Sequence, residues 1–293
     1  MSSPRKQSPV TIDLSLWDRS RGRILAGKGG WVPTKGLVYS HGYSLLTDLV
    51  GKKSFFEVLV LNVTGRLPEP RLAQWLEGLF LCLSWPDARI WCNQVGALAG
   101  TMGTSPVAAV AAGVLASDSR MYGPGVMMAC VRFIDEALSW HQGEEMCGAE
   151  IIVRYQERVK KAVPQIPGYR RPVPQNGAHQ ASPLSPFDER VSPMKRLAHR
   201  LGYQVGPRLR LAHKIHAHMR QSGGAINLAG YAAAFLRDAG FTPAEICRLL
   251  CTWVHAGVQA CYAEAAERPA GTFYPLRCKD VGYQGTPPRP VPE

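Results

Sequence analysis

Hydrophobic residues recur along most of the chain at the spacing of an α-helix. Between Leu72 and Leu83, leucine, tryptophan and phenylalanine lie three and four positions apart, which places them on one helical face. The apolar run at 54–63 has no period, so it fits a buried strand and a buried helix equally well. No segment alternates between apolar and polar residues for long. The pattern therefore predicts an all-α fold.

Glycine and proline divide the remaining helical segments. The segments 88–100 and 105–116 are rich in alanine, glycine and valine, and such small side chains let helices approach closely in an interior or at a subunit interface. Thr242, Pro243 and Glu245 form a helix start with a capping box, and we expect this helix to run unbroken to about residue 266. Further helices are expected at 43–46, 131–138, 150–163, 192–201, 208–220 and 225–236, and an irregular loop at 164–186.

Positive charge is concentrated in the middle of the chain. The net charge is +12, and residues 154–220 hold 14 Lys or Arg against 3 Asp or Glu. This excess fits a polyanionic ligand, either a nucleotide-containing cofactor or a nucleic acid, but it also fits a plain solvated surface. Zinc-finger and RNP spacings are absent from the sequence, so nucleic acid is not the expected partner.

The cysteines and the lengths of the apolar segments bear on where in the cell the protein is expected. Eight single cysteines without a CxxC pair suggest reduced, buried thiols. We find no signal-peptide core and no apolar stretch long enough to cross a membrane, so a soluble cytoplasmic protein is expected. His213, His216 and His218 lie close together without a carboxylate or cysteine at matching spacing. They are expected on a solvated basic helix face, and no metal site is predicted.

A Gly-Pro-Gly turn opens a buried helix at 122–133. Its first residues, Val126, Met127 and Met128, cannot move a proton or carry charge. His41 lies in another turn, where it can contact an anion, donate a proton or make only a structural hydrogen bond.

Four stretches of the chain, in order, resemble motifs of the citrate synthase family. HGYSLLTDLVGKKSFFEVLVLNVTGRLP is similar to the early R-G-Y segment and the following apolar helix that ends in G-x-L-P, and YGPGVMMA is similar to G-P-x-H-G-G-A. PGYRRP with the later DER is similar to P-G-[FY]-G-H-x and D-P-R. NLAGYAAAFL followed by AGF is similar to N-x-D-G-x-x-A-A-x-L and x-G-[FI]. The resemblance spans about 37–290.

The resemblance implies a citrate-synthase-like fold: a large helical domain, a smaller helical domain inserted into it, and an intimate dimer whose partner contributes a residue to each cleft. On this chain 1–36 would be a lead-in, 37–137 and 231–293 the large domain, and 138–230 the small basic domain. The family condenses an acyl-CoA with a 2-oxo acid. CoA would therefore be a substrate, with no tightly bound cofactor.

The resemblance also implies which residues bind ligands. The residues expected at CoA are Gly168, Tyr169 and Arg170, and those expected at a carboxylate substrate are Arg190, Arg268, Asn227 and Met127.

The departures from the family pattern fall on its catalytic positions. The two histidines and the aspartate of the family align with Val126, Arg171 and Ala229, and a family arginine aligns with Val254. Removing one acid–base group commonly costs a factor of about 10²–10⁴ in rate, so loss of all three makes ordinary citrate synthesis a poor expectation. Arg171 can stabilise an oxyanion, but it is a poor proton donor at neutral pH.

Two hypotheses remain open. The first is a diverged carbon–carbon bond-forming or -cleaving enzyme of specialised metabolism, acting on an acyl thioester, a 2-oxo acid or a di- or tricarboxylic acid without the usual machinery, with Arg171 and His41 as remaining candidates for chemistry. The second is a non-catalytic relative that acts as a ligand sensor or pairs with an active paralogue. Either protein would be a dimer, of itself or with the paralogous subunit.

Overall fold

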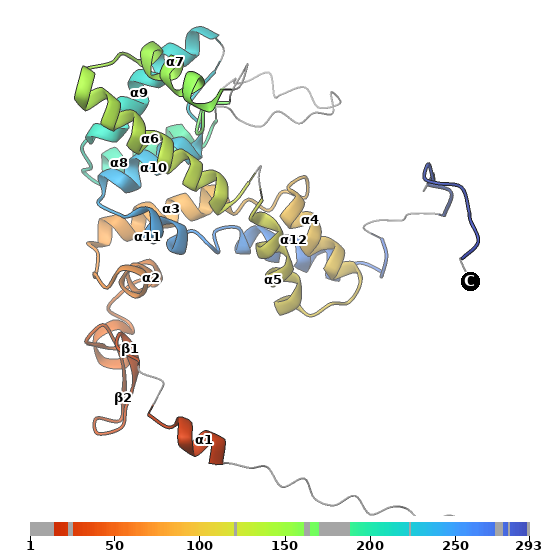
Figure 1. The fold of residues 1–293 in the computed structure, drawn as a ribbon. Helices are drawn as coiled ribbons and strands as arrows, with labels where there is room; N and C mark the ends of the chain where they lie inside the picture. The colour runs from red at the N-terminus through yellow and green to blue at the C-terminus, as the bar shows by residue number, and fades with distance from the viewer. Residues whose placement is uncertain are drawn as a thin grey trace, which may run out of the picture. The chain divides into compact units, whose positions relative to one another are not determined.

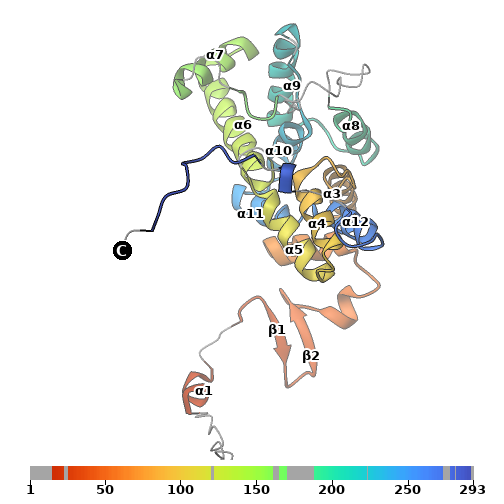
Figure 2. The same ribbon diagram turned by 90° about the vertical axis from the view of Figure 1, so that its right-hand side faces the viewer.

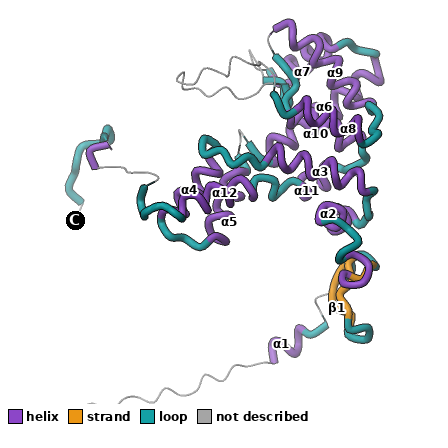
Figure 3. Tube along the Cα trace, turned by 180° about the vertical axis from the view of Figure 1, so that it is seen from behind, coloured by secondary structure: helices purple, strands orange, loops and turns teal. Residues whose placement is uncertain are grey.

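The computed structural model describes residues 15–22, 26–119, 122–160, 165–169, 188–222, 224–272, 278–280 and 282–291 (Figure 1). The chain divides into two compact units, Met1–Leu67 and Pro68–Glu293. In the described part, twelve α-helices and three short strands confirm a mostly helical protein. Figure 3 shows the strands confined to the first unit.

The first unit contains a small sheet that the sequence pattern does not predict. After α1 (Ser15–Ser20), β1 (Gly29–Val32), β2 (Leu37–Ser40) and β3 (Tyr43–Ser44) form an antiparallel sheet in the order β1-β2-β3. The helix expected after the glycine turn starts only at η1 (Leu45–Leu49), a single π-helical turn. Strands of two to four residues are too short to produce a readable alternation.

The undecided apolar run of the first unit is helical. It forms α2 (Phe55–Thr64), which begins with a reciprocal capping box between Ser54 and Glu57. The helix ends at Gly65, whose φ of 77° is the left-handed conformation that glycine adopts without strain.

The second unit consists of helices joined by short connections. Their bounds are α3 (Pro70–Leu83), α4 (Trp91–Thr101), α5 (Pro106–Ser117), α6 (Pro124–Glu144), α7 (Gly148–Val159), α8 (Val191–Arg200), α9 (Pro207–Met219), η2 (Arg220–Ser222), α10 (Leu228–Asp238), α11 (Pro243–Leu249), α12 (His255–Ala266) and η3 (Cys278–Asp280). The predicted face of α3 is buried, and its Trp75 stacks on Phe235 of α10 at 3.8 Å between ring centroids.

Helix α6 is the long element against which α7, α9 and α10 pack (Figure 2). Asp135 of α6 accepts hydrogen bonds from Arg208 of α9 at 2.6 Å and from Arg237 of α10 at 2.8 Å. Asp238, at the end of α10, accepts from the backbone N–H of Leu209 in the first turn of α9 at 2.9 Å. These part-buried charged groups fix the three helices relative to one another.

Helices α4, α5 and α12 form a second packed group. A Cβ added at Gly100 of α4 would lie 2.7 Å from the carbonyl oxygen of Tyr262 on α12, so only glycine permits this approach. The expectation that small residues allow close helix packing is confirmed for the interior of this group.

The prediction of one continuous helix from 242 to 266 is wrong, because this segment forms two helices, α11 and α12. The chain turns at 250–254, where Trp253 is buried and its carbonyl oxygen accepts from Oγ of Ser84 at 2.5 Å. Gly257 lies against the backbone of Trp85, with its Cβ position 2.5 Å from that carbonyl oxygen. Packing against the end of α3 therefore overrides a continuous helical propensity.

The domain bounds expected from the resemblance remain predictions. The described helices place α7, α8 and α9 within the proposed small domain, and α3 to α5, α11 and α12 within the proposed large one.

Candidate functional site

The N-terminus of α10 joins three segments of the candidate site. Asn227 caps the helix, because its Oδ1 accepts from the backbone N–H of Gly230 at 3.0 Å. The backbone N–H of Asn227 donates to the carbonyl oxygen of Gly168 at 2.8 Å, and that of Leu228 donates to Oδ2 of Asp188 at 3.0 Å. The start of this helix therefore holds both Gly168 and Asp188 in place.

Gly168 packs directly on Gly230 and on helix α6. It has φ of 86°, and a Cβ at this position would lie 2.6 Å from Cα of Gly230 and 3.4 Å from Sγ of Cys130. Val126 lies one helical turn before Cys130, and Ala229 directly precedes Gly230. The structure thus brings the segments that carry Val126, Gly168 and Ala229 together.

Tyr169 supports this loop from within the protein. Its side chain is buried, its hydroxyl donates to the carbonyl oxygen of Ala212 at 3.0 Å, and burial raises its pKa well above the usual value. Its own carbonyl oxygen accepts from the backbone N–H of Ala225 at 3.1 Å. The next two residues, Arg170 and Arg171, lie outside the described part of the chain.

Arg190 is the charged side chain of the site. Asp188 accepts from its Nε at 2.8 Å and from its Nη2 at 2.7 Å, and the carbonyl oxygen of Cys82 accepts from Nη1 at 3.4 Å. A guanidinium has five N–H groups, so two of them have no acceptor among the described residues. With 19% of its side chain exposed, Arg190 can offer those two donors to a carboxylate.

Asp188 holds Arg190 and does not act as a base. Burial alone would raise its pKa, but the hydrogen bonds and charge of Arg190 outweigh that influence and leave the pKa below its usual value. The carboxylate is therefore ionised at neutral pH, and both of its oxygen atoms already accept hydrogen bonds. Sequence reasoning missed this residue, although its spacing two positions before Arg190 was visible.

Aromatic side chains surround the turn that precedes α6. The ring of Tyr122 lies edge-on to Trp91 at 5.5 Å between centroids and 6.2 Å from Trp253. The guanidinium carbon of Arg190 lies 5.4 Å from the centroid of Trp85. This aromatic cluster, defined as Trp85, Trp91, Tyr122 and Trp253, was not predicted from the sequence.

Two groups of the site, Cys130 and Tyr122, stay protonated at neutral pH. Burial raises the pKa of Cys130 to about 12, and burial likewise raises that of Tyr122 to about 12, so both groups keep their protons. Met127 is fully buried and Val126 is half-buried. Oδ1 of Asp118 accepts from the backbone N–H of Gly125, next to Val126, at 3.3 Å. The described site can bind and orient an anion, while Val126 and Ala229 themselves offer no base.

The described contacts of His41 and Arg268 are with residues outside the candidate site. His41 belongs to the first unit, has φ of 50°, shares a 3.2 Å hydrogen bond with Oγ of Ser40, and packs against Gly65. Arg268 follows α12 and pairs with Glu264. No described contact joins either residue to Arg190.

The histidines of α9 are more buried than expected. His213 is half-buried, and burial, with a further contribution from Lys195, lowers its pKa to about 4. Nδ1 of His216 accepts from the backbone N–H of Ile226 at 3.0 Å. The prediction of a solvated basic face is therefore wrong for these two residues. The ring of His213 is desolvated, and His216 is hydrogen-bonded to the backbone just before α10. The described residues contain no cluster of metal-ligating side chains.

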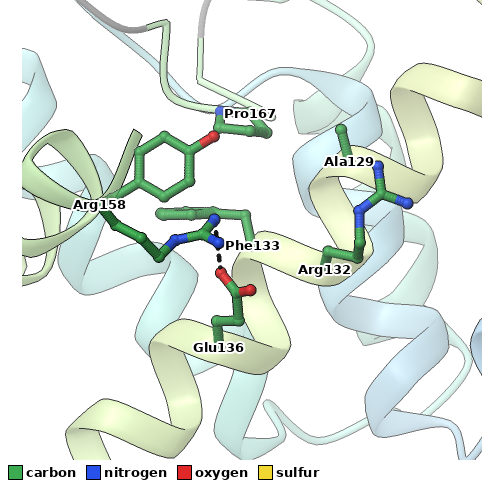
Figure 4. Close-up of a pocket in the computed structure, with 7 residues that line it drawn as sticks. Ala129, Arg132, Phe133, Glu136, Arg158 and Pro167 are labelled. Atoms are coloured by element: carbon green, nitrogen blue, oxygen red, sulfur yellow. Dashed lines mark ion pairs between the residues drawn. The ribbon is translucent and has the colours of Figure 1, made fainter. Parts of the chain in front are cut away.

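A pocket of about 140 Å³ lies beside Pro167, between α6 and α7. Figure 4 shows Arg158 facing Glu136 across this pocket and Arg132 on the same helix as Ala129. Nη2 of Arg158 lies 3.0 Å from Oε2 of Glu136, and the aromatic wall is Phe133 with Tyr155. Two guanidinium groups against one carboxylate leave the pocket with a net positive charge.

Solved structures share this arrangement of helices. The chain is similar to the citryl-CoA lyase of Hydrogenobacter thermophilus, with a TM-score of 0.73 and 25% identity over 92% of this chain and 97% of the lyase. The fold is that of the citrate synthase superfamily. The expected citrate-synthase-like fold is thereby confirmed.

Two further superfamily structures match at 14% identity, which supports the fold alone. ATP citrate lyase from Methanothrix soehngenii, in complex with citrate and coenzyme A, has a TM-score of 0.71 over 98% of this chain and 46% of that one. Citrate synthase from Thermoplasma acidophilum, in complex with carboxymethyl coenzyme A and oxaloacetate, has a TM-score of 0.59 over 82% of this chain and 59% of that one.

The citrate synthase superfamily relationship is seen in structure and not by sequence comparison. No protein-family model matches the chain, and no curated protein sequence matches it. Among the described helices none is both long and apolar enough to cross a membrane.

Proposed function

We propose that this protein is a diverged enzyme of the citrate synthase superfamily that forms or cleaves a carbon–carbon bond of an acyl-CoA thioester. The observation that carries the proposal is the convergence of Arg190, the Gly168 loop and the first turn of α6 around the N-terminus of α10. The citryl-CoA lyase relative is named for a CoA thioester, and the ATP citrate lyase and citrate synthase structures hold coenzyme A and carboxymethyl coenzyme A, respectively. Arg190, with two available donors, binds the carboxylate of the acid substrate.

The missing acid–base groups restrict which substrates can react. Val126 and Ala229 cannot polarise a carbonyl group or remove an α-proton. The carbon nucleophile must therefore arrive activated, as a β-keto thioester or an enol does, and the protein contributes orientation. Val126 provides an apolar wall that keeps water from the reacting carbon, and Arg171 is the cation proposed for the developing oxyanion.

Coenzyme A binds along Gly168, Tyr169 and Arg170 in this proposal, as a substrate. The pocket beside Pro167 supports this assignment, because Arg132 and Arg158 supply positive charge next to the loop. Arg132 is exposed and has no ion-pair partner among the described residues. It is the group best placed to take a phosphate oxygen without disturbing an existing pair.

Turnover of a CoA thioester tests the proposal. Acetyl-CoA, acetoacetyl-CoA and citryl-CoA, each alone and with oxaloacetate or pyruvate, are followed by chromatography of the CoA esters, because cleavage of citryl-CoA gives acetyl-CoA and oxaloacetate and condensation gives a new thioester, and neither step frees a thiol. We expect acetoacetyl-CoA or citryl-CoA to be converted and acetyl-CoA to remain. Replacing Arg190 with lysine keeps the charge but loses the planar fork, and we expect it to lower kcat/KM by about tenfold or more.

Calorimetry with CoA separates binding from turnover. The variant Arg132→Gln is expected to weaken CoA binding by about tenfold, because one charge-assisted hydrogen bond contributes about 1.5 kcal/mol. Arg21→Gln, at an exposed position of the first unit, is the matched control. Absence of both thioester conversion and CoA binding would contradict the proposal. CoA binding without turnover would favour a ligand sensor or the partner of an active paralogue.

A dimer completes the proposal, since α5 presents an apolar outer face. The helix carries no charged residue, and Val107 and Leu115 are 80% and 77% exposed. Leu98 of α4 and Met102, which directly follows that helix, are also exposed. An exposed apolar patch of this kind is typical of a protein–protein interface. A second copy of the chain is the proposed occupant. The family resemblance implies that a partner contributes one residue to the cleft, and Arg268 is the candidate that we propose for it.

The variant Leu115→Asp is expected to convert the dimer to a monomer, because it places a charge in the centre of the apolar face. Size-exclusion chromatography with light scattering measures the change in mass. Val205→Asp introduces the same charge at an exposed apolar residue away from this face and should leave the mass unchanged. A dimer that survives Leu115→Asp would place the interface elsewhere.

A further inference from the structure

The aromatic cluster lies beside the cation that holds the substrate carboxylate. Trp85 lies under the guanidinium of Arg190, and Tyr122, within electrostatic range of the same guanidinium, contacts both Trp91 and Trp253. Trp85, Tyr122 and Trp253 lie in junctions between helices, and Trp91 is the first residue of α4. Arg190 donates to the carbonyl oxygen of Cys82 and the hydroxyl of Tyr122 donates to that of Leu83, each at 3.4 Å, so both lie at the end of α3 beside the half-buried ring of Trp85.

The described walls next to this surface are apolar. Val126 occupies the first turn of α6, and Val254, directly after Trp253, is buried. The indole Nε1 of Trp253 is also buried and has no acceptor among the described residues. A buried donor without an acceptor is unfavourable, so an oxygen atom of a ligand would satisfy it.

We propose that the acid substrate carries a flat aromatic or unsaturated group, which packs on Trp85 and Tyr122 while its carboxylate binds the two available N–H groups of Arg190. Its carbonyl oxygen is the acceptor for Nε1 of Trp253. This inference rests on the proposed function and names the substrate class of that site.

The physical reason is complementarity between the ligand and both parts of the surface. An aromatic ring packs on another ring in an offset or edge-on geometry, with a gain beyond the area that it buries. A second carboxylate facing Trp85 and Val126 would instead lose its hydration without gaining a partner among the described side chains. The surface therefore favours an aromatic 2-oxo acid over a small dicarboxylic one.

Equilibrium titration tests the inference without requiring turnover. Phenylpyruvate, pyruvate and oxaloacetate are the probes, and tryptophan fluorescence and calorimetry are the readouts. We expect phenylpyruvate to bind about tenfold or more tightly than either of the others. Trp85→Leu should reduce phenylpyruvate affinity by about tenfold and leave pyruvate affinity unchanged, so that the discrimination disappears.

Two further variants keep the test sharp. Trp253→Phe retains a ring but removes the N–H group, and it should weaken both 2-oxo acids to a similar extent. Trp31→Leu, at an exposed position of the first unit, is the control and should change neither affinity. Circular dichroism checks that each variant is folded, and Tyr122→Leu replaces Trp85→Leu if the latter is not.

Equal affinities for the three acids, tighter binding of oxaloacetate, or unchanged discrimination in Trp85→Leu would overturn the inference. The proposed function fails on a different measurement, namely the absence of thioester conversion and of CoA binding. The two failures can therefore be told apart.

Discussion

Replacing Asp188 with alanine is expected to destabilise the protein by about 3–5 kcal/mol, the usual cost of removing one partner from a buried ion pair. Asp188 is buried and accepts two hydrogen bonds from the guanidinium of Arg190, one from the backbone N–H of Arg190 and one from the backbone N–H of Leu228. The variant leaves a largely desolvated guanidinium and an unpaired N–H group of Leu228 at the start of α10. Urea denaturation followed by circular dichroism measures the loss.

The matched control for this variant is Asp87→Ala. Asp87 makes a similar bidentate pair with an arginine two positions later, but Arg89 is exposed. An exposed pair contributes about 0–1 kcal/mol, so Asp87→Ala should be nearly neutral. Equal effects of the two variants would contradict the structural role assigned to Asp188.

The same pair has a pH dependence of known sign. The pKa of Asp188 in the folded protein lies below its value in the unfolded chain. Its stabilisation is therefore fully present above the unfolded pKa, which is about 3.9, and is lost as the pH falls through the folded pKa. The stability difference between the native protein and Asp188→Asn should shrink as the pH is lowered through this range. A difference that stays constant down to pH 2 would contradict the assignment.

Replacing Gly230 with valine is expected to cost about 3 kcal/mol or more and to abolish CoA binding. A Cβ at this position would overlap the carbonyl oxygen of Gly168 and lie 2.9 Å from its Cα. That oxygen cannot move away freely, because it accepts from the backbone N–H of Asn227. Thermal denaturation measures the stability, and calorimetry measures the binding of CoA.

Gly143→Val provides the control for Gly230→Val. Gly143 lies in the last turn of α6, is exposed, and has no atom within 4 Å of its Cβ position. Its replacement should have little effect on stability and none on CoA binding. If Gly230→Val behaved like this control, the close approach of α10 to the Gly168 loop would not be needed for binding.

Local periodicity predicted the helices whose buried face is marked by the spacing of apolar residues within the helix itself. Helix α3 buries the face that its leucine and aromatic spacing marks, and α11 begins at the expected capping box of Thr242 and Glu245. The end of that helix could not be predicted. The break before α12 depends on Gly257 meeting the backbone of Trp85, a contact between residues 172 positions apart in the chain.

The candidate site could be predicted only in part, for a similar reason. Motif resemblance pointed to Arg190, Gly168 and Asn227, and the structure connects them through the N-terminus of α10. The aromatic cluster was not predicted, because Trp85 and Trp253 are far apart in the sequence and no local pattern links them. The assignments of His41, Arg268, Arg170 and Arg171 stay predictions.

The contact between Gly168 and Gly230 separates two kinds of evolutionary constraint. Any side chain at either position collides with the other backbone, so selection for a folded protein is enough to retain both glycines whatever the protein catalyses. Val126 and Ala229 are half-buried. If they occupy the catalytic positions, as the motif resemblance implies, they would be free to change once the family reaction is no longer required. Glycines of this kind are retained because the fold requires them. The residues beside them are retained only while the reaction requires them, so a motif can keep its glycines after it has lost its catalytic side chains.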